Sequence, residues 1–342
     1  MIHRWLWVIR GSALLAAIAL LLPLYCCSQA VSNAPIKVGI IGLDTSHVIV
    51  FTKALNDAAD KDHVEGLRVV AAFKGGSPDV ESSRSRADEF TAELRDKWKI
   101  EIVGDIPTLC SKVDAVLLES VDGRTHLEQV EPVFAAHKPV FIDKPLAGSY
   151  KDAKEIADLS KAAGVPWFTA SSLRFWSETE RLKNPKGIGR VLAFDVLGPT
   201  IREPHVPSLV NYGVHAVEML YQFMGPGCES VSMQVSGNQD VVVGKWKDGR
   251  LGVVRGFSSG LYAFSITVYG EKGILHSEEK PEGYGPLLVQ IARFFKTRVA
   301  PIDPRESVEI IAFMEAADLS QARGGTAVPL SEIMGAGVRL GS

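Results

Sequence analysis

The sequence predicts an α/β protein in which a doubly wound parallel sheet precedes an α+β domain with a large, mostly antiparallel sheet. Two patterns predict this fold. Residues 36–170 alternate short apolar runs with amphipathic helical segments, and later residues form successive strand-like runs with few helices between them. With 342 residues, the chain is long enough for two buried cores, which we place in residues 36–148 and 149–335. The net charge of −3 argues against a nucleic-acid binder.

The first 30 residues differ from the rest of the chain. A basic start, an apolar run over residues 12–25 and a small–x–small ending at residues 28–30 are typical of a secretory signal peptide. The apolar run is short for a membrane span, which needs about 20 residues. We therefore expect an exported protein, attached to a membrane only if the leader is uncleaved or if Cys26 or Cys27 is lipidated.

The front half contains six predicted strands joined by crossover helices, so its sheet is expected to be parallel. The strands are predicted at residues 36–41, 67–73, 100–103, 113–118, 139–142 and 165–169, and the helices at 46–60, 81–98, 126–136 and 150–163. In such a sheet the ligand binds beyond the carboxyl ends of the strands. Four loops should therefore surround one cleft, namely residues 42–47, 74–77, 119–126 and 143–145.

The first of these loops is where a dinucleotide pyrophosphate would meet a helix N-terminus. Gly42 supplies the tight turn, but Asp44 and His47 stand where the G-x-G-x-x-G pattern has its second and third glycines. Asp44 could face a ligand or cap the helix. The predicted cofactor-binding residues are Gly39, Gly42, Asp44, Thr45, Ser46, His47, Lys74, Glu119, His126 and Asp143.

The second loop influences the choice of cofactor. It offers no acid for a ribose hydroxyl, whereas Lys74 and Ser77 suit a 2′-phosphate, so the prediction is NAD or NADP with NADP favoured. The three carboxylates of Asp44, Glu119 and Asp143 could crowd the same cleft. Together with His47 or His126 they could hold a cation, but because no ligand spacing supports one, we predict no metal site.

An ordered set of motifs resembles one known family, that of glucose–fructose oxidoreductase and inositol dehydrogenase (Gfo/Idh/MocA). The motifs include a strand at residues 114–120, His126, Asp143-Lys144-Pro145 in place of the family's Glu-Lys-Pro, and Arg174-Phe175. Further motifs that match the family lie at residues 187–191, 211–218 and 268–273. The resemblance covers about residues 36–330 and implies a Rossmann domain that binds NAD or NADP.

The resemblance also implies site residues for the oxidation of a hydroxyl of a sugar or cyclitol-like substrate. Lys144 and His215 correspond to the family residues beside the reacting carbon, with Asn211 near them. An imidazole suits removal of the hydroxyl proton, and an ammonium group stabilises the developing alkoxide. We predict Asn211, His215 and Glu218 on one helical face. Arg174 could contact the substrate or form a structural ion pair.

The back half carries the second predicted sheet. Its strands are expected at residues 191–197, 230–235, 241–247, 251–257 and 262–268, and its helices at 207–223, 286–295 and 304–322. With helices on one face, the other face is free for a partner, so a homo-oligomer through this sheet is plausible.

Three functions remain open at this point. The first is an exported NAD(P)-dependent oxidoreductase acting on a carbohydrate-like substrate. The second is a secreted carbohydrate-binding protein or lyase that has lost the cofactor on the same fold. The third is a structural protein that keeps the sheet for subunit contacts, because a fold does not by itself fix a function.

Overall fold

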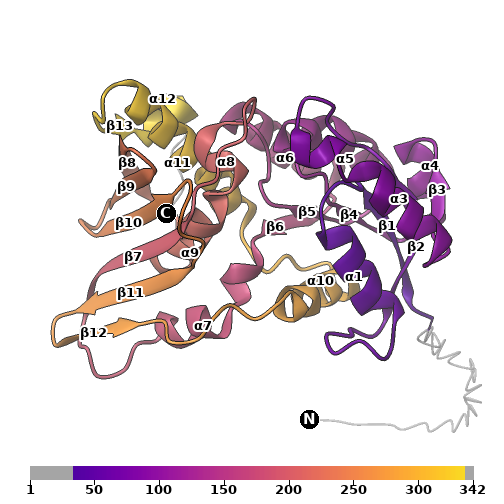
Figure 1. Cartoon of the computed structure of the whole chain (residues 1–342), viewed down its shortest axis with the longest axis horizontal. Helices are drawn as coiled ribbons and strands as arrows, with labels where there is room; N and C mark the ends of the chain where they lie inside the picture. The colour runs from indigo at the N-terminus through magenta and orange to yellow at the C-terminus, as the bar shows by residue number, and fades with distance from the viewer. Residues whose placement is uncertain (1–33, 336–342) are drawn as a thin grey trace, which may run out of the picture. The chain divides into compact units, whose positions relative to one another are not determined.

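The computed structural model describes residues 34–335, which form one compact unit with two sheets (Figure 1). The predicted leader, with Cys26 and Cys27, lies outside the described residues. Within residues 34–335, no helix is both long and apolar enough to cross a membrane.

The first sheet is parallel throughout, as the sequence predicts, and its strand order is β3-β2-β1-β4-β5-β6. Its strands are β1 (Ile36–Ile41), β2 (Leu67–Phe73), β3 (Glu101–Val103), β4 (Ala115–Leu118), β5 (Val140–Asp143) and β6 (Trp167–Ala170). Its helices are α1 (His47–Asn56), α2 (Glu81–Arg84), α3 (Ala87–Asp96), α4 (Ile106–Lys112), α5 (His126–Ala135) and α6 (Tyr150–Ala163). The strand order reverses between β1 and β4, which is where this fold binds its ligands.

Both faces of this sheet are covered, which explains why its strands are almost entirely apolar. Ile41, Leu118 and Ile142 pack in one core with residues of α4, α5 and α6. Val38, Ile40 and Phe141 face the other core, with residues of α1 and α3. This second core also contains Leu288, Ile291 and Phe294 of α10 (Gly285–Thr297), so a late helix completes the first sheet.

The second sheet has seven strands in the order β12-β11-β7-β10-β9-β8-β13, and only the β7–β10 pair is parallel. Its strands are β7 (Val191–Pro199), β8 (Cys228–Ser236), β9 (Gln239–Trp246), β10 (Leu251–Phe257), β11 (Ser265–Gly270), β12 (Gly273–His276) and β13 (Val328–Pro329). The remaining helices are α7 (Ser177–Lys183), α8 (Ser208–Asn211), α9 (Val214–Met224), α11 (Pro304–Ala322) and α12 (Leu330–Met334).

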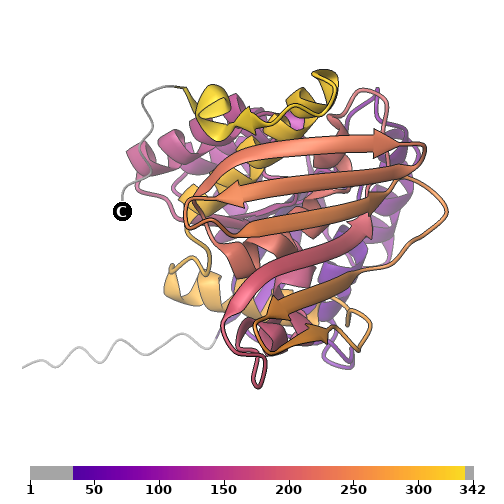
Figure 2. The ribbon, with the colours of Figure 1, turned by 90° about the vertical axis from the view of Figure 1, so that its left-hand side faces the viewer.

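Helices cover one face of this second sheet. α9 packs on β7 and β10, and α11 packs on β8, whereas no helix of residues 34–335 crosses the face turned to the viewer in Figure 2. Association of copies through this face stays a prediction.

Two glycines near the first loop have different roles. Gly42 has φ +85°, and a Cβ added there would lie 2.2 Å from Oγ of Ser120, so no other residue fits this turn. An added Cβ at Gly39, inside β1, would instead meet Leu109 of α4 at 3.0 Å. Gly39 therefore permits close helix–strand packing, and this packing accounts for the glycine without a cofactor contact.

Candidate functional site

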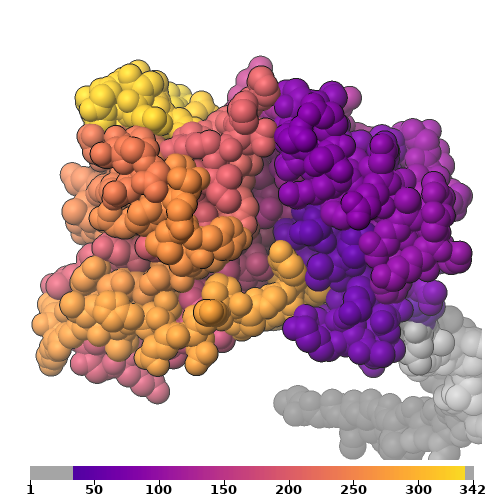
Figure 3. All heavy atoms as spheres, viewed as in Figure 1, coloured from indigo at the N-terminus to yellow at the C-terminus, as the bar shows by residue number. Residues whose placement is uncertain are grey.

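A cleft of about 440 Å³ lies beyond the carboxyl ends of the first sheet, beside the second. In Figure 3 the surface is hollowed where the indigo and purple segments meet the pink and orange ones. The first half supplies Thr45, Ser46, His47 and Lys144 to its walls, and the second half supplies His215. The topology therefore brings together residues that the sequence predicted from separate loops.

The loop between β1 and α1 turns the Asp44 side chain inward. Its fully buried carboxylate accepts hydrogen bonds from Oγ of Ser83 at 2.6 Å and from the Val121 amide at 3.0 Å. Asp44 thus ties the first loop to α2 and to the loop after β4. The prediction that it contacts a cofactor is wrong, and it does not cap α1 either, because Ser46 is the N-cap residue.

The same loop leaves backbone amides unpaired beside the cleft. Among the described residues, the amides of Thr45 and Ser46 donate to no acceptor, and both residues line the cleft with Arg86. Unpaired amides at a helix N-terminus beside a cation form a site for an anion such as a pyrophosphate.

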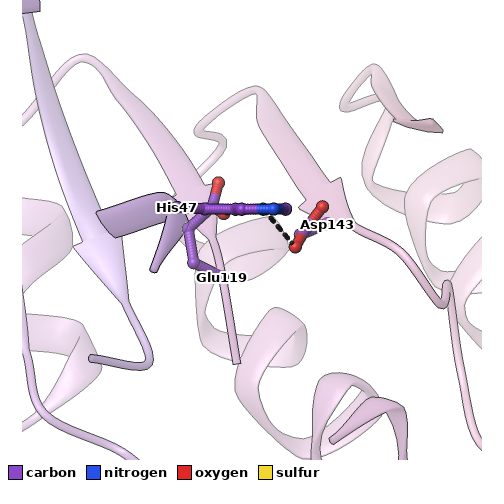
Figure 4. Close-up of side chains that lie close together, drawn as sticks. All are labelled: His47, Glu119 and Asp143. Atoms are coloured by element: carbon purple, nitrogen blue, oxygen red, sulfur yellow. Dashed lines mark ion pairs between the residues drawn. The ribbon is translucent and has the colours of Figure 1, made fainter. Parts of the chain in front are cut away.

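His47, Glu119 and Asp143 form a buried cluster at the base of this cleft (Figure 4). Nδ1 of His47 lies 2.8 Å from Oδ2 of Asp143 and 3.6 Å from Oε2 of Glu119. Burial and the charge of Asp143 raise the pKa of Glu119 to about 7. Burial opposes ionisation of His47, but the Asp143 charge outweighs it and raises the pKa to about 8. Glu119 and Asp143 are 0% and 1% exposed, so neither reaches a ligand in the cleft directly.

Lys144 and His215 face the cleft from opposite halves of the chain. Nζ of Lys144 lies 3.5 Å from Oδ2 of Asp143, which holds the ammonium group at the end of β5. Nδ1 of His215 lies 2.7 Å from Oγ of Ser171. Burial, together with the charge of Lys144, places the pKa of His215 well below its ordinary value, so the imidazole is neutral at pH 7.

Comparisons with known proteins agree with this architecture. Residues 36–171 match the model of an oxidoreductase family with an NAD-binding Rossmann fold, Gfo/Idh/MocA. Myo-inositol 2-dehydrogenase of Thermotoga maritima is 28% identical over 273 residues, which are 72% of this chain and 76% of that protein. Residues 36–171 thus match the Gfo/Idh/MocA family over its NAD-binding Rossmann domain. This match confirms the resemblance seen in the sequence for that part of the chain.

Solved structures of other proteins share the whole two-sheet fold. A probable dehydrogenase from Thermotoga maritima has a TM-score of 0.71 and 22% identity, covering 87% of this chain and 100% of that one. Myo-inositol dehydrogenase from Lactobacillus casei, solved with NAD(H) and myo-inositol, has a TM-score of 0.70 and 16% identity, covering 90% of this chain and 98% of that one. The predicted two-sheet fold is confirmed.

The structure does not bring Asn211 together with Lys144 and His215. Asn211 ends α8, where its amide nitrogen donates to the Ile201 carbonyl at 2.9 Å, and it is not among the residues lining the cleft. The predicted helix over 207–223 breaks at Tyr212, whose φ of −134° is not helical. The catalytic role of Asn211 stays a prediction without support from this geometry.

Arg174 is structural. It is 2% exposed, its Nη1 lies 2.8 Å from Oε2 of Glu218, and its Nη2 pairs with Glu306. The guanidinium group thus forms the ion pairs of the structural alternative, and Arg174 is not among the residues lining the cleft. Glu218 faces Arg174 rather than the cleft.

His126 is also structural. It is fully buried, with Nε2 2.8 Å from the Ser120 carbonyl and Nδ1 3.1 Å from the Leu146 carbonyl. It holds the loops after β4 and β5 together, and its prediction as a cofactor contact is wrong. Lys74, by contrast, lines a separate hollow of about 260 Å³ with Ser77 and Arg84, and pairs with Asp88 at 2.6 Å.

Sequence reasoning missed the aromatic wall of the cleft, made by Tyr212, Tyr262, Phe264 and Tyr284. The Tyr212 ring meets the His215 ring edge-on at 4.9 Å, and the hydroxyl groups of Tyr212 and Tyr262 are hydrogen-bonded. Tyr284 packs edge-on against His47 at 4.6 Å. No periodic signal marks these residues, because they lie in loops or at helix ends.

Proposed function

We propose that this protein is an NAD(P)-dependent oxidoreductase that interconverts a hydroxyl group and a ketone on a sugar or cyclitol-like substrate. One observation carries the proposal: Lys144 and His215 line the same cleft. Thr45 and Ser46, whose backbone amides at a helix N-terminus are unpaired among the described residues, line it too. The myo-inositol dehydrogenases among the relatives support this substrate class.

The residues present fit a dinucleotide. The Asp44 carboxylate is bound by Ser83 and Val121 inside the protein, so its charge does not face a pyrophosphate in the cleft. The amides of Thr45 and Ser46 and the side chain of Arg86 would hold that pyrophosphate. The hollow beside Lys74 would receive the adenosine end. The bound nicotinamide would supply the hydride acceptor or donor.

The chain's own residues then carry the proton chemistry. With the proton on Nδ1 donated to Oγ of Ser171, the neutral His215 keeps the Nε2 lone pair for a substrate hydroxyl in the cleft. The Lys144 ammonium group stabilises the alkoxide as the proton leaves. The tyrosine hydroxyls of the aromatic wall offer hydrogen bonds to the other hydroxyls of a polyol.

We further propose NADP as the preferred cofactor. Lys74 and Arg84 line the adenosine hollow, whose only carboxylate, Asp88, already pairs with Lys74 and is 91% exposed. Replacing Lys74 by alanine is expected to weaken NADPH binding about tenfold, because one charge-assisted hydrogen bond to a phosphate contributes about 1.5–3 kcal/mol. NADH binding should change less than twofold. Titrations followed by nicotinamide fluorescence measure both constants.

Lys97→Ala is the matched control. Lys97 is an exposed lysine directly after α3, and like Lys74 it forms an ion pair with a surface carboxylate, here that of Glu93. Equal losses for NADH and NADPH in Lys74→Ala would contradict the NADP preference. Absence of binding of either nucleotide to the wild-type protein would contradict the oxidoreductase proposal itself.

A second candidate is a lyase or carbohydrate-binding protein that uses the same cleft without a cofactor. Glu119 favours it, because this buried carboxyl group stands beside Asp143 in the part of the fold where a nicotinamide is expected. In that case the aromatic wall would still bind a sugar, and the nucleotide titrations would show no binding.

We also propose that the protein is exported through its leader. The basic start, the short apolar run and the small–x–small ending at residues 28–30 support this. Mass spectrometry of the protein made by a secreting bacterial host is expected to find a mature N-terminus directly after Ala30. A chain that keeps residues 1–30 would contradict cleavage, and added lipid mass on Cys26 or Cys27 would indicate a lipoprotein.

A further inference from the structure

We propose that His47, Glu119 and Asp143 bind one divalent transition-metal cation, Zn²⁺ or Mn²⁺, at the base of the cleft. Each residue offers one ligand atom, and these three atoms lie within 4.8 Å of one another. The proposal does not rest on the proposed oxidoreductase function, because cation binding can be measured without any nucleotide.

The first argument is that the carboxylates of the cluster lack donors. All four carboxylate oxygens of Glu119 and Asp143 are buried, and none has a hydrogen-bond partner among the described residues. The chain satisfies comparable buried acids elsewhere: Asp44 accepts from two donors, and both oxygens of Asp240 accept from Arg202 or Thr200. A buried carboxylate without donors is costly, so a missing partner is indicated here.

The second argument comes from the orientation of the imidazole. Although Nδ1 of His47 lies 2.8 Å from Oδ2 of Asp143, it makes no hydrogen bond. Figure 4 shows the His47 ring edge-on, with this oxygen to one side of the ring plane. The in-plane direction at Nδ1 is thus left for another atom, and a metal ion bound there would displace the Nδ1 proton. A tetrahedral Zn²⁺ in the ring plane would hold its carboxylate ligands off that plane.

The third argument is the local charge. Two carboxylates face the cluster, and the nearest permanent cation is Lys144, which lies 3.5 Å from Asp143. No lysine or arginine forms an ion pair with Glu119 among the described residues. A divalent cation would neutralise Glu119 while leaving the Lys144–Asp143 contact in place.

The donor set determines the class of cation. One imidazole nitrogen and two carboxylates suit Zn²⁺ or Mn²⁺, whereas Mg²⁺ and Ca²⁺ prefer oxygen donors alone. Three protein ligands leave at least one position open, as in catalytic metal sites. His47 and Lys144 both line the cleft, so this position would be filled from the cleft by water or by a hydroxyl group of a bound ligand.

The test is calorimetric titration of the chelator-treated protein with ZnCl₂ and, separately, MnCl₂. We expect the wild type to bind one equivalent of at least one of these ions, with a rise in Tm. Glu119→Gln and Asp143→Asn should each weaken binding by more than about 100-fold, which exceeds the effect of losing an outer partner of a metal ligand. Without metal, Glu119→Gln should have a Tm at least equal to that of the wild type, because it removes a buried charge.

Asp44→Asn is the matched control. It removes one negative charge from the same loop region without removing a proposed ligand, so its affinity should stay within about twofold of the wild type. Lack of saturable binding of both ions to the wild type would overturn the proposal. Equal affinity of the wild type and Glu119→Gln would also overturn it, as would an equal loss in Asp44→Asn, which would indicate attraction by general charge.

Discussion

Replacing His215 by asparagine is expected to lower kcat for oxidation of the preferred polyol by about 10²–10⁴-fold, the usual contribution of a general base. The imidazole is held by Ser171 through Nδ1 and faces the cleft, so asparagine keeps a polar group there but cannot take up the proton. The measurement is the initial rate of nicotinamide reduction with a panel of cyclitols and aldoses. KM should change much less than kcat, because the lost interaction belongs to the transition state.

The pH profile provides a second readout for His215. Because its pKa lies well below 6.5, the imidazole stays neutral as pH falls through 7, and the rate should decline only at more acidic pH. The control is Asn211→Ala, which removes an amide that lies outside the cleft and should leave kcat within about twofold. If His215→Asn, folded as judged by its Tm, turned over substrate at the wild-type rate, His215 would not be the base.

Arg174→Met is expected to lower the free energy of unfolding by about 3–5 kcal/mol, because it leaves two carboxylates beside an uncharged buried side chain. Glu218 and Glu306 both pair with this guanidinium group, which connects η2 (Ser172–Phe175) to α9 and α11. Urea unfolding followed by circular dichroism measures the change. The double variant Arg174→Met, Glu218→Gln should recover part of the loss, since one of the uncompensated charges is then gone.

The matched control for Arg174 is Arg190→Met. Arg190 pairs with Glu271 at 2.8 Å, but its side chain is 73% exposed, and exposed pairs contribute about 0–1 kcal/mol. Similar losses of stability in the two arginine variants would contradict the structural role assigned to Arg174.

Elements with strong local signals could be predicted from the sequence. The bounds of β1, β2, β10, α6 and α11 agree with the predicted ones. α6 begins after a Ser149 cap and ends at Gly164 in the left-handed conformation, and both residues are common at helix ends. The short helix α4 was missed, although Asp105 caps it by accepting from the Thr108 amide. The break between α8 and α9 lies at Tyr212, which has a non-helical φ of −134° that periodicity does not reveal.

The site could be predicted only in part. Lys144 and the loop around His47 follow strands of one parallel sheet, so topology alone brings them to one edge. The direction of the Asp44 side chain could not be predicted, because its partners Ser83 and Val121 lie 39 and 77 residues further along the chain. His215 was found through its family motif, whereas Tyr262 and Tyr284 reach the cleft through a tertiary arrangement that no local pattern encodes.

The placement of α10 has a consequence for synthesis. Leu288, Ile291 and Phe294 pack in the same core as Phe141 and Phe168, so the part of this face that α10 covers stays open until residues 285–297 have been made. Domains generally fold in order as they are made, but here the front sheet cannot complete its packing ahead of the back half. The finished core of the first sheet therefore forms only late in translation.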